Sequence, residues 1–259
     1  MGTDAPAALS VPDDLPDRPA AVTFKHDARS TVWAVAGEGP RDEGLVVKRF
    51  NAPRWQQAWR RALRMHPADR ERRAHRALVK AGGPVVPHAG HGVDAAGRSW
   101  VATPRRGPSA DRALAGAGDA ELVFGGRGRQ PLAARRRLVR AAGTLTGALW
   151  LRKTKNRDHK VSNLVLPPGG DGATLELIDG LGVGSTKGAP LFAAALPMLL
   201  RLRDSAAEAA ARHADPRLRT VSRTDRLRFF RAAVDAMGGE VADGVHRLPR
   251  HAAFNEPRP

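Results

Sequence analysis

The regular pattern of the chain starts near Ala21, where short apolar runs alternate with polar segments. The runs AAVTF, STVWAVAG and GLVVKRF are rich in β-branched and aromatic residues. Runs of this length and composition between polar breaks are typical of β-strands, and their close spacing favours an antiparallel meander. The pattern therefore predicts three strands at the start of the folded part.

Helical spacing follows these strands. Trp55, Trp59 and Leu63 recur at every fourth position after a proline, which predicts a first helix. A second helix is expected from about residue 67 to the glycine pair at 82 and 83. Residues 85–104 then predict two more strands around a turn, so that a five-stranded sheet with helices forms the first lobe.

The second half of the chain is predicted to be mainly helical. Apolar residues at helical spacing mark a long amphipathic helix: Leu138, Ala142, Leu145 and Leu149. Helical segments rich in Ala and Leu continue from about residue 188. The predicted fold class is therefore α+β, with an antiparallel sheet and helices in an N-terminal lobe and a mainly helical C-terminal lobe.

Three segments are expected from these patterns. Residues 1–18 are rich in Pro and Asp with little periodicity, which is typical of a flexible arm. The N-terminal lobe is expected over residues 19–104 and the C-terminal lobe over residues 105–259.

Composition limits the classes of function. The chain has no cysteine, which excludes a disulfide scaffold and thiolate metal sites. Its net charge of +17 attracts polyanions, including nucleic acid, anionic membranes and phosphorylated substrates. Specific nucleic-acid binding is not expected, because zinc-ligand spacing and an aromatic RNA-binding motif are absent and aromatic residues make up 5% of the chain.

The cellular compartment is also indicated by composition. No apolar stretch approaches the roughly 20 residues that span a bilayer. The first residues carry acidic side chains where a signal peptide needs positive charge. We therefore expect a cytoplasmic protein.

Residues 151–183 carry the candidate chemistry. Asp158, Lys160 and Asn163 lie in a predicted loop between the long helix and a short apolar strand. The turn sequence PPGGDG then predicts a hairpin whose second strand ends at Asp179. The open end of such a hairpin brings Asn163 and Asp179 together, and two hard oxygen donors suit Mg²⁺. Asp158 is placed to accept a proton from a hydroxyl, and Lys160 to neutralise charge on a phosphoryl group.

The order of these residues resembles the motifs of the protein kinase-like superfamily. NRDHKVSN, at residues 156–163, resembles the catalytic-loop motif H-R-D-L-K-x-x-N, and IDG at residues 178–180 resembles the metal-binding D-F-G. VVKRF supplies Lys48 on the third predicted strand, where the family has its phosphate-binding lysine. Glu71 lies in the following helical segment, where the family has the glutamate that pairs with that lysine.

Within that superfamily the chain is similar to the lipopolysaccharide kinases that phosphorylate Kdo and heptose. The similarity extends over RSTVWAV, the segment from Glu71 to Pro87, WVATP and VSRTDRLRFFRAAV. It implies a two-lobed kinase-like fold and ATP-dependent transfer of the γ-phosphate to a sugar hydroxyl of the lipopolysaccharide inner core. The substrate would be an anionic glycolipid or sugar, and the cationic surface would hold the enzyme at the cytoplasmic face of the inner membrane.

The resemblance also assigns roles to individual residues. Asp158 is the expected catalytic base, and Lys160 stabilises the transferred phosphoryl group. Asn163 and Asp179 are the expected Mg²⁺ ligands. Lys48 would hold the α- and β-phosphates of ATP, with Glu71 fixing its rotamer.

Several departures from the family pattern leave alternatives open. Asn156 replaces the first His of the loop motif, and His159 replaces its Leu. The segment HDARST, at residues 26–31, has no glycine, so side chains of residues 29–31 are expected to contact phosphate there. Glu71 has an alternative role as a partner of His75 or of a neighbouring Arg, and Asp69 is an alternative partner for Lys48. The competing functions are another kinase-like phosphotransferase, acting on a small molecule or protein, and a catalytically silent pseudokinase scaffold; the oligomeric state stays open.

Overall fold

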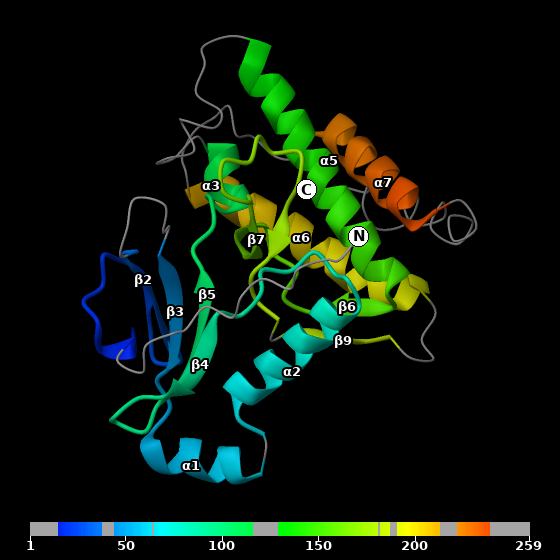
Figure 1. Cartoon of the computed structure of the whole chain (residues 1–259). Helices are drawn as coiled ribbons and strands as arrows, with labels where there is room; N and C mark the ends of the chain where they lie inside the picture. The colour runs from blue at the N-terminus through cyan, green and yellow to red at the C-terminus, as the bar shows by residue number, and fades with distance from the viewer. Residues whose placement is uncertain are drawn as a thin grey trace, which may run out of the picture. The chain divides into compact units, whose positions relative to one another are not determined.

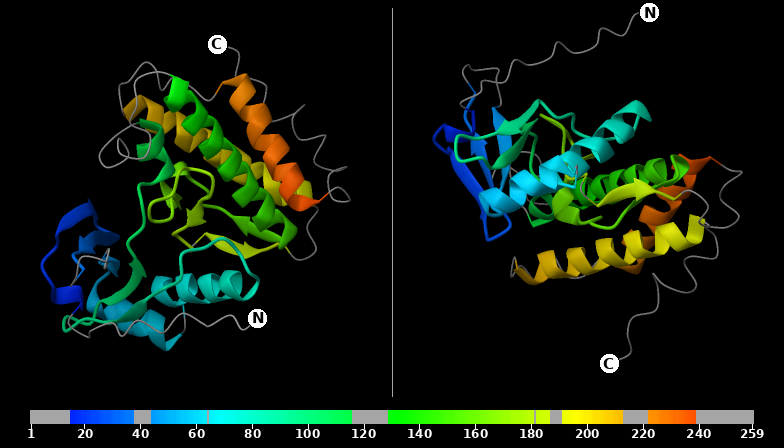
Figure 2. Two further views of the ribbon diagram at one scale, coloured as in Figure 1. Left: turned by 45° about the horizontal axis from the view of Figure 1, so that its top comes forward. Right: turned by 90° about the horizontal axis from the view of Figure 1, so that it is seen from below.

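The computed structural model describes residues 15–37, 44–63, 65–115, 129–180, 182–186, 191–212 and 222–238. The chain divides into two compact units. The first unit contains Met1–His75 and Val86–Arg105, and the second contains Arg76–Val85 and Arg106–Pro259. Figures 1 and 2 show the helices and strands of both units.

The first unit is built on a five-stranded sheet in the order β1-β2-β3-β5-β4. Every neighbouring pair in this sheet is antiparallel, as the sequence predicts. Its strands are β1 (Val22–His26), β2 (Ser30–Val35), β3 (Leu45–Phe50), β4 (Gly90–Val93) and β5 (Ser99–Pro104). Strand β3 lies between β2 and β5, so Lys48 is opposite Val32 on one side and Val101 on the other.

The core of the first unit contains side chains from β2, β3 and β5. Trp33, Val47, Trp100 and Ala102 are buried together there. Leu15 joins this cluster from the short helix η1 (Leu15–Asp17), and it is 1% exposed. The arm expected over residues 1–18 therefore ends in a packed segment, because Leu15 finds an apolar site; residues 1–14 lie outside the described residues.

Two helices follow β3, as the sequence predicts. They are α1 (Arg54–Ala62) and α2 (Pro67–Lys80). The last boundary between the units lies after Arg105, close to residue 104 where the sequence predicts it, and the segment Arg76–Val85 also belongs to the second unit. The reason is that Leu78 and Val85 are buried in the core of the second unit.

The second unit is mainly helical, with two small hairpins. Its helices are α3 (Ala110–Ala115), α5 (Arg129–Leu151), α6 (Leu191–Arg212) and α7 (Arg223–Met237). Strand β6 (Thr154–Asn156) pairs with β9 (Val183–Ser185), and β7 (Leu164–Val165) pairs with β8 (Glu176–Leu177). The α+β architecture, with an antiparallel sheet and a mainly helical second part, is the one that the sequence predicts. Within the described residues, no helix is long and apolar enough to cross a membrane.

Helices α5 and α7 lie side by side in the second unit (Figures 1 and 2). Gly143 and Gly147 on α5 permit this close approach. A Cβ atom on either glycine would lie 2.2 Å from a backbone oxygen of α7, that of Phe229 or that of Ala233. The N-terminus of α7 is fixed by Asp225, whose carboxylate lies 3.0 Å from the guanidinium of Arg135 on α5.

We expect Gly147→Ala to destabilise the protein. Alanine is the better helix former by about 1 kcal/mol, but the added methyl group would collide with the backbone of α7, and overpacking of this kind costs roughly 1–3 kcal/mol. Denaturant unfolding would measure the difference in unfolding free energy. Gly184→Ala is the control, because the nearest atom to its Cβ lies 3.7 Å away. A Gly147→Ala variant as stable as the wild type would contradict this account of the helix contact.

Candidate functional site

Lys48 on β3 and Glu71 on α2 form a largely buried ion pair in the first unit. Lys48 Nζ lies 2.8 Å from Glu71 Oε2, and the two side chains are 19% and 3% exposed. A carboxylate buried to this extent needs a charged partner, because an unpaired charge would lose its hydration without compensation. The geometry therefore holds the ammonium group of Lys48 at one position over the sheet.

The alternative partners of these two residues are engaged elsewhere. Asp69 lies 3.6 Å from Arg72, one turn further along α2. The ring of His75 stacks on His88 with 3.9 Å between centroids, and its Nε2 atom contacts the carbonyl oxygen of Val86. Burial lowers the pKa of His75, and it lowers the pKa of His88 to about 3, so the stacked rings are neutral near pH 7.

The segment at residues 26–31 forms a closed turn. The Asp27 carboxylate accepts hydrogen bonds of 2.8 Å from the backbone N–H groups of Arg29 and Ser30. Its hydrogen bond with Lys25, together with these two N–H groups, lowers the pKa of Asp27 to about 2. In a glycine-rich loop such N–H groups face phosphate oxygens, whereas here they face a carboxylate of the protein.

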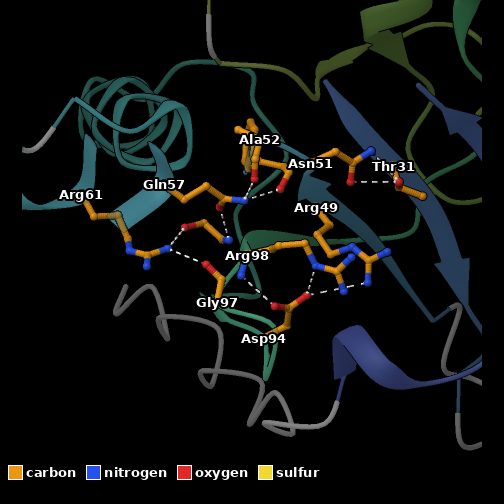
Figure 3. Close-up of polar contacts among 11 residues, drawn as sticks. Thr31, Arg49, Asn51, Ala52, Gln57, Arg61, Asp94, Gly97 and Arg98 are labelled. Carbon is orange, nitrogen blue, oxygen red and sulfur yellow. Dashed lines mark hydrogen bonds and ion pairs between the residues drawn. The ribbon is translucent and has the colours of Figure 1, made fainter. Parts of the chain in front are cut away.

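Fewer of residues 29–31 are therefore able to contact phosphate than the sequence predicts. Ser30 and Thr31 are 5% and 8% exposed. The Thr31 hydroxyl is occupied by Asn51, which lies 3.0 Å away (Figure 3). The exposed Arg29 is the residue of the three whose side chain is presented to solvent.

In the second unit, three of the predicted residues converge on one loop. Lys160 Nζ lies 2.6 Å from Asp158 Oδ1. The Asn163 amide donates to the Asp158 carbonyl at 2.9 Å and to Asp158 Oδ2 at 3.3 Å. The loop thus presents a carboxylate, an ammonium group and an amide within one cluster, all partly exposed.

The hairpin places Asp179 next to this cluster. Leu164 of β7 pairs with Leu177 of β8, and the N–H of Ile178 donates to the carbonyl oxygen of Asn163 at 3.1 Å. Asp179 is the next residue, at the open end of the hairpin, as the spacing predicts. The Asn163 amide nitrogen donates to Asp158, and the hairpin brings Asn163 and Asp179, an amide and a carboxylate, to the same end.

This donor set fits Mg²⁺, which takes one or two protein oxygens and fills its remaining positions with water and phosphate. No group of three or more His, Cys, Asp or Glu residues that could hold a metal ion occurs in the described part of the chain. The pair Asn163 and Asp179 stays the candidate metal centre that the sequence predicts.

Asn156 supports the loop that carries Asp158. Its side chain is fully buried, and its Oδ1 atom accepts a hydrogen bond of 3.0 Å from the backbone N–H of Asp158. Asn156, which stands where the resembled motif has histidine, thus hydrogen-bonds to the backbone of the loop. Gly182, the residue before β9, adds a second support, since the N–H of Arg157 donates to its carbonyl oxygen at 3.0 Å.

Gly182 and Arg201 belong to this site but were not predicted. A Cβ atom at Gly182 would lie 2.6 Å from Asn156 Oδ1 and 2.7 Å from the backbone nitrogen of Asp158, so only glycine fits there. The alternating glycines at 180, 182 and 184 were the available signal for it. Arg201 comes from α6, and its Nε atom lies 4.0 Å from Asp158 Oδ1. No local motif marks it.

His159 is fully buried beside Asp158. Its Nε2 atom lies 2.9 Å from the hydroxyl of Thr146 on α5, and burial lowers its pKa from 6.5 to about 4. Further along the same loop, Val161 donates its N–H to the Ser205 hydroxyl of α6 at 3.1 Å. The loop is therefore tied to both long helices of its unit.

Two solved structures with low sequence identity are similar to the chain. One is described as WaaP in complex with acyl carrier protein, with 18% identity, a TM-score of 0.46, and coverage of 90% of this chain and 88% of that chain. Another is the kinase domain of Mycobacterium tuberculosis PknI, with 17% identity, a TM-score of 0.43, and coverage of 88% and 94%. No protein-family model and no curated protein sequence matches.

We expect His159→Leu to flatten the pH dependence of stability. In the unfolded chain the imidazole takes up a proton near pH 6.5, whereas the folded site resists protonation down to about pH 4. The unfolded state thus binds more protons in this window, and the unfolding free energy falls as the pH falls from 6.5 to 4. The shift corresponds to roughly 3 kcal/mol at the acid end.

Denaturant unfolding between pH 7 and pH 4 measures this effect. His75 and His88 also resist protonation, so part of the decline remains in the variant. The matched control replaces the exposed His26 by Leu. If the unfolding free energies of wild type and His159→Leu changed in parallel between pH 7 and pH 4, the buried, neutral state of His159 would be disproved.

Proposed function

We propose that the chain is an ATP-dependent, kinase-like phosphotransferase. The observation that carries the proposal is the cluster in the second unit, where Asp158, Lys160 and Asn163 are in contact and the hairpin places Asp179 beside Asn163. A carboxylate beside a cation and an amide–carboxylate pair is the set of groups that phosphoryl transfer to a hydroxyl requires.

In this proposal Asp158 binds the acceptor hydroxyl and takes its proton. Lys160 Nζ lies 2.6 Å from Oδ1 of the same carboxylate. From there its positive charge stabilises the negative charge that develops on the transferred phosphoryl group. Asn163 and Asp179 would hold Mg²⁺, whose chemical contribution is to neutralise phosphate oxygens. Asn156 and Gly182 keep the Asp158 backbone at a fixed position, so that the carboxylate needs little reorganisation.

Lys48 supplies the positive charge for the α- and β-phosphates of ATP. Its ion pair with Glu71 supports this role, because the buried carboxylate limits the rotamers of the lysine and lowers the entropy lost on phosphate binding. Arg29 is the exposed cation of the segment that replaces a glycine-rich loop.

The proposed acceptor is a sugar hydroxyl of an anionic glycolipid, of the Kdo or heptose type found in the lipopolysaccharide inner core, reached from the cytoplasm. Arg201 supports an anionic acceptor, since its guanidinium lies 4.0 Å from the Asp158 carboxylate and is partly exposed. The same guanidinium also lies 3.4 Å from the carboxylate of Glu208 on α6, which holds it near the loop.

One observation favours a second candidate, the pseudokinase scaffold. Asp27 occupies the backbone N–H groups of Arg29 and Ser30, which removes two donors from the expected phosphate grip. A scaffold of this kind would bind nucleotide weakly or without metal, so nucleotide binding separates the two functions.

Mg²⁺-dependent ATP binding is expected to raise the thermal unfolding midpoint. A ligand at 100 times its Kd stabilises the folded state by about 2.7 kcal/mol, which is several degrees in midpoint. Asp179→Ala is expected to remove the Mg²⁺-dependent part of the shift. Tripolyphosphate is the control for charge alone; equal shifts with ATP and tripolyphosphate, independent of Mg²⁺, would count against a nucleotide site.

Asp158→Asn is expected to abolish transfer and retain ATP binding. The substitution keeps the shape of the side chain but removes the proton acceptor, which is worth about 100-fold to 10,000-fold in kcat. Phosphate incorporation into an acidic sugar acceptor and the thermal midpoint with ATP would be measured on the same preparation. Near wild-type turnover in Asp158→Asn would exclude the role of this residue.

A further inference from the structure

Helix α1 is amphipathic, but its apolar face is exposed to solvent. An apolar stripe on a helix of a globular domain ordinarily faces the core. In α1 the polar face contacts the rest of the first unit, and the apolar face is exposed. Hydrogen bonds of the polar face set this orientation.

Gln57 anchors the inner face of α1. Its side chain is fully buried, and its Nε2 atom donates to the carbonyl oxygens of Phe50 at 2.9 Å and Ala52 at 2.5 Å. Its Oε1 atom accepts a hydrogen bond of 2.7 Å from the N–H of Ser99 on β5. Every one of these bonds would be lost if the helix rotated to bury its apolar stripe, which would leave a buried amide site unsatisfied.

Arg61 adds a second anchor one turn further along. Its guanidinium donates to the carbonyl oxygen of Gly97 and to the hydroxyl of Ser99, both at 3.0 Å (Figure 3). The turn that carries Gly97 is itself held by Asp94, which pairs with Arg98 at 2.8 Å and with Arg49 at 3.7 Å. The orientation of α1 is therefore fixed to the β4–β5 hairpin.

The outer face of α1 carries large apolar side chains in solvent. Trp55 is 70% exposed, Trp59 is 62% exposed and Leu63 is 50% exposed, and their spacing of four places them on one side of the helix. Met65 follows at 60% exposed. By contrast, the other three tryptophans of the chain, Trp33, Trp100 and Trp150, are 4%, 4% and 2% exposed.

The charge of α1 itself is positive. The helix has no acidic residue, and Arg60, which directly follows Trp59 in the sequence, is exposed. An exposed arginine on the same short helix as exposed tryptophans matches a surface that is both apolar and anionic.

We propose that α1 is a membrane-surface anchor, which lies in the plane of an anionic bilayer with Trp55, Trp59 and Leu63 in the headgroup–acyl boundary. Nine residues of helix are only about 14 Å long. One face of a helix this short buries much less than the roughly 800 Å² per partner that a stable protein interface or a dimer needs. A bilayer sets no such minimum, because binding grows with each apolar side chain inserted and each arginine near anionic headgroups.

Vesicle binding tests this proposal independently of phosphotransfer, since it needs neither nucleotide nor acceptor. The full-length protein is mixed with phosphatidylglycerol-containing vesicles or with pure phosphatidylcholine vesicles. We expect co-sedimentation and a blue shift of tryptophan emission with the anionic vesicles only. The shift reports on α1, because the three other tryptophans are already buried.

Variants assign the binding to the stripe. The double variant Trp55→Ser/Trp59→Ser is expected to weaken binding to anionic vesicles at least tenfold, with an unchanged circular dichroism spectrum. The conservative double variant Trp55→Phe/Trp59→Phe should still bind while losing most of the emission shift. Val93→Ser, at another half-exposed apolar position of the same unit, is the matched control and should bind as the wild type does.

Three results would overturn the proposal. One is no co-sedimentation of the wild type with anionic vesicles, and another is equal binding of the double Ser variant and the wild type. The third is concentration-dependent self-association without lipid that the double Ser variant abolishes, which would make a second copy the occupant. Arg60→Glu and about 0.5 M salt are both expected to weaken vesicle binding, because exposed charges are screened within a few ångströms at that ionic strength.

Discussion

The structure around the candidate site depends on one constraint: the loop that carries Asp158 adds little more than Val161 to the apolar core and is held mainly by hydrogen bonds. Asn156 accepts the Asp158 N–H, Gly182 accepts the Arg157 N–H, and Ser205 accepts the Val161 N–H. These partners come from β6, from the residue before β9 and from α6. Because each bond contributes only about 1 kcal/mol net, the position of the loop depends on all of them together. Glycine at 182 follows from this constraint, since a methyl group there would displace both Asn156 and Asp158.

Much of the fold could be predicted from periodicity, and the reasons are local. The five strands of the first unit have the length and composition that identify strands without tertiary information. The hairpin argument placed Asp179 beside Asn163 because the order of two paired strands determines which ends meet. Residues that reach the site from distant elements could not be predicted in this way. Arg201 comes from α6, more than 40 positions after Asp158, and nothing in its neighbourhood distinguishes it from other surface arginines.

Periodicity indicates that a helix has two faces, but it does not indicate which face meets the protein. In α1 the stripe of Trp55, Trp59 and Leu63 predicted a helix correctly, and its orientation was decided by Gln57 and Arg61, whose partners lie about 40 residues away on the β4–β5 hairpin. The expected phosphate contacts at residues 29–31 differed for the same kind of reason. Asp27 and Asn51 bind the groups that a sequence pattern alone leaves available.

The contact between α5 and α7 has a consequence for synthesis of the chain. Arg135 and its partner Asp225 are separated by 90 positions. At a translation rate of 5–20 residues per second, roughly 5–20 s pass before the ribosome has made the segment that covers Gly143 and Gly147. During that interval the side of α5 that carries Gly143 and Gly147 lacks its helical partner, so this helix contact forms only at the end of synthesis.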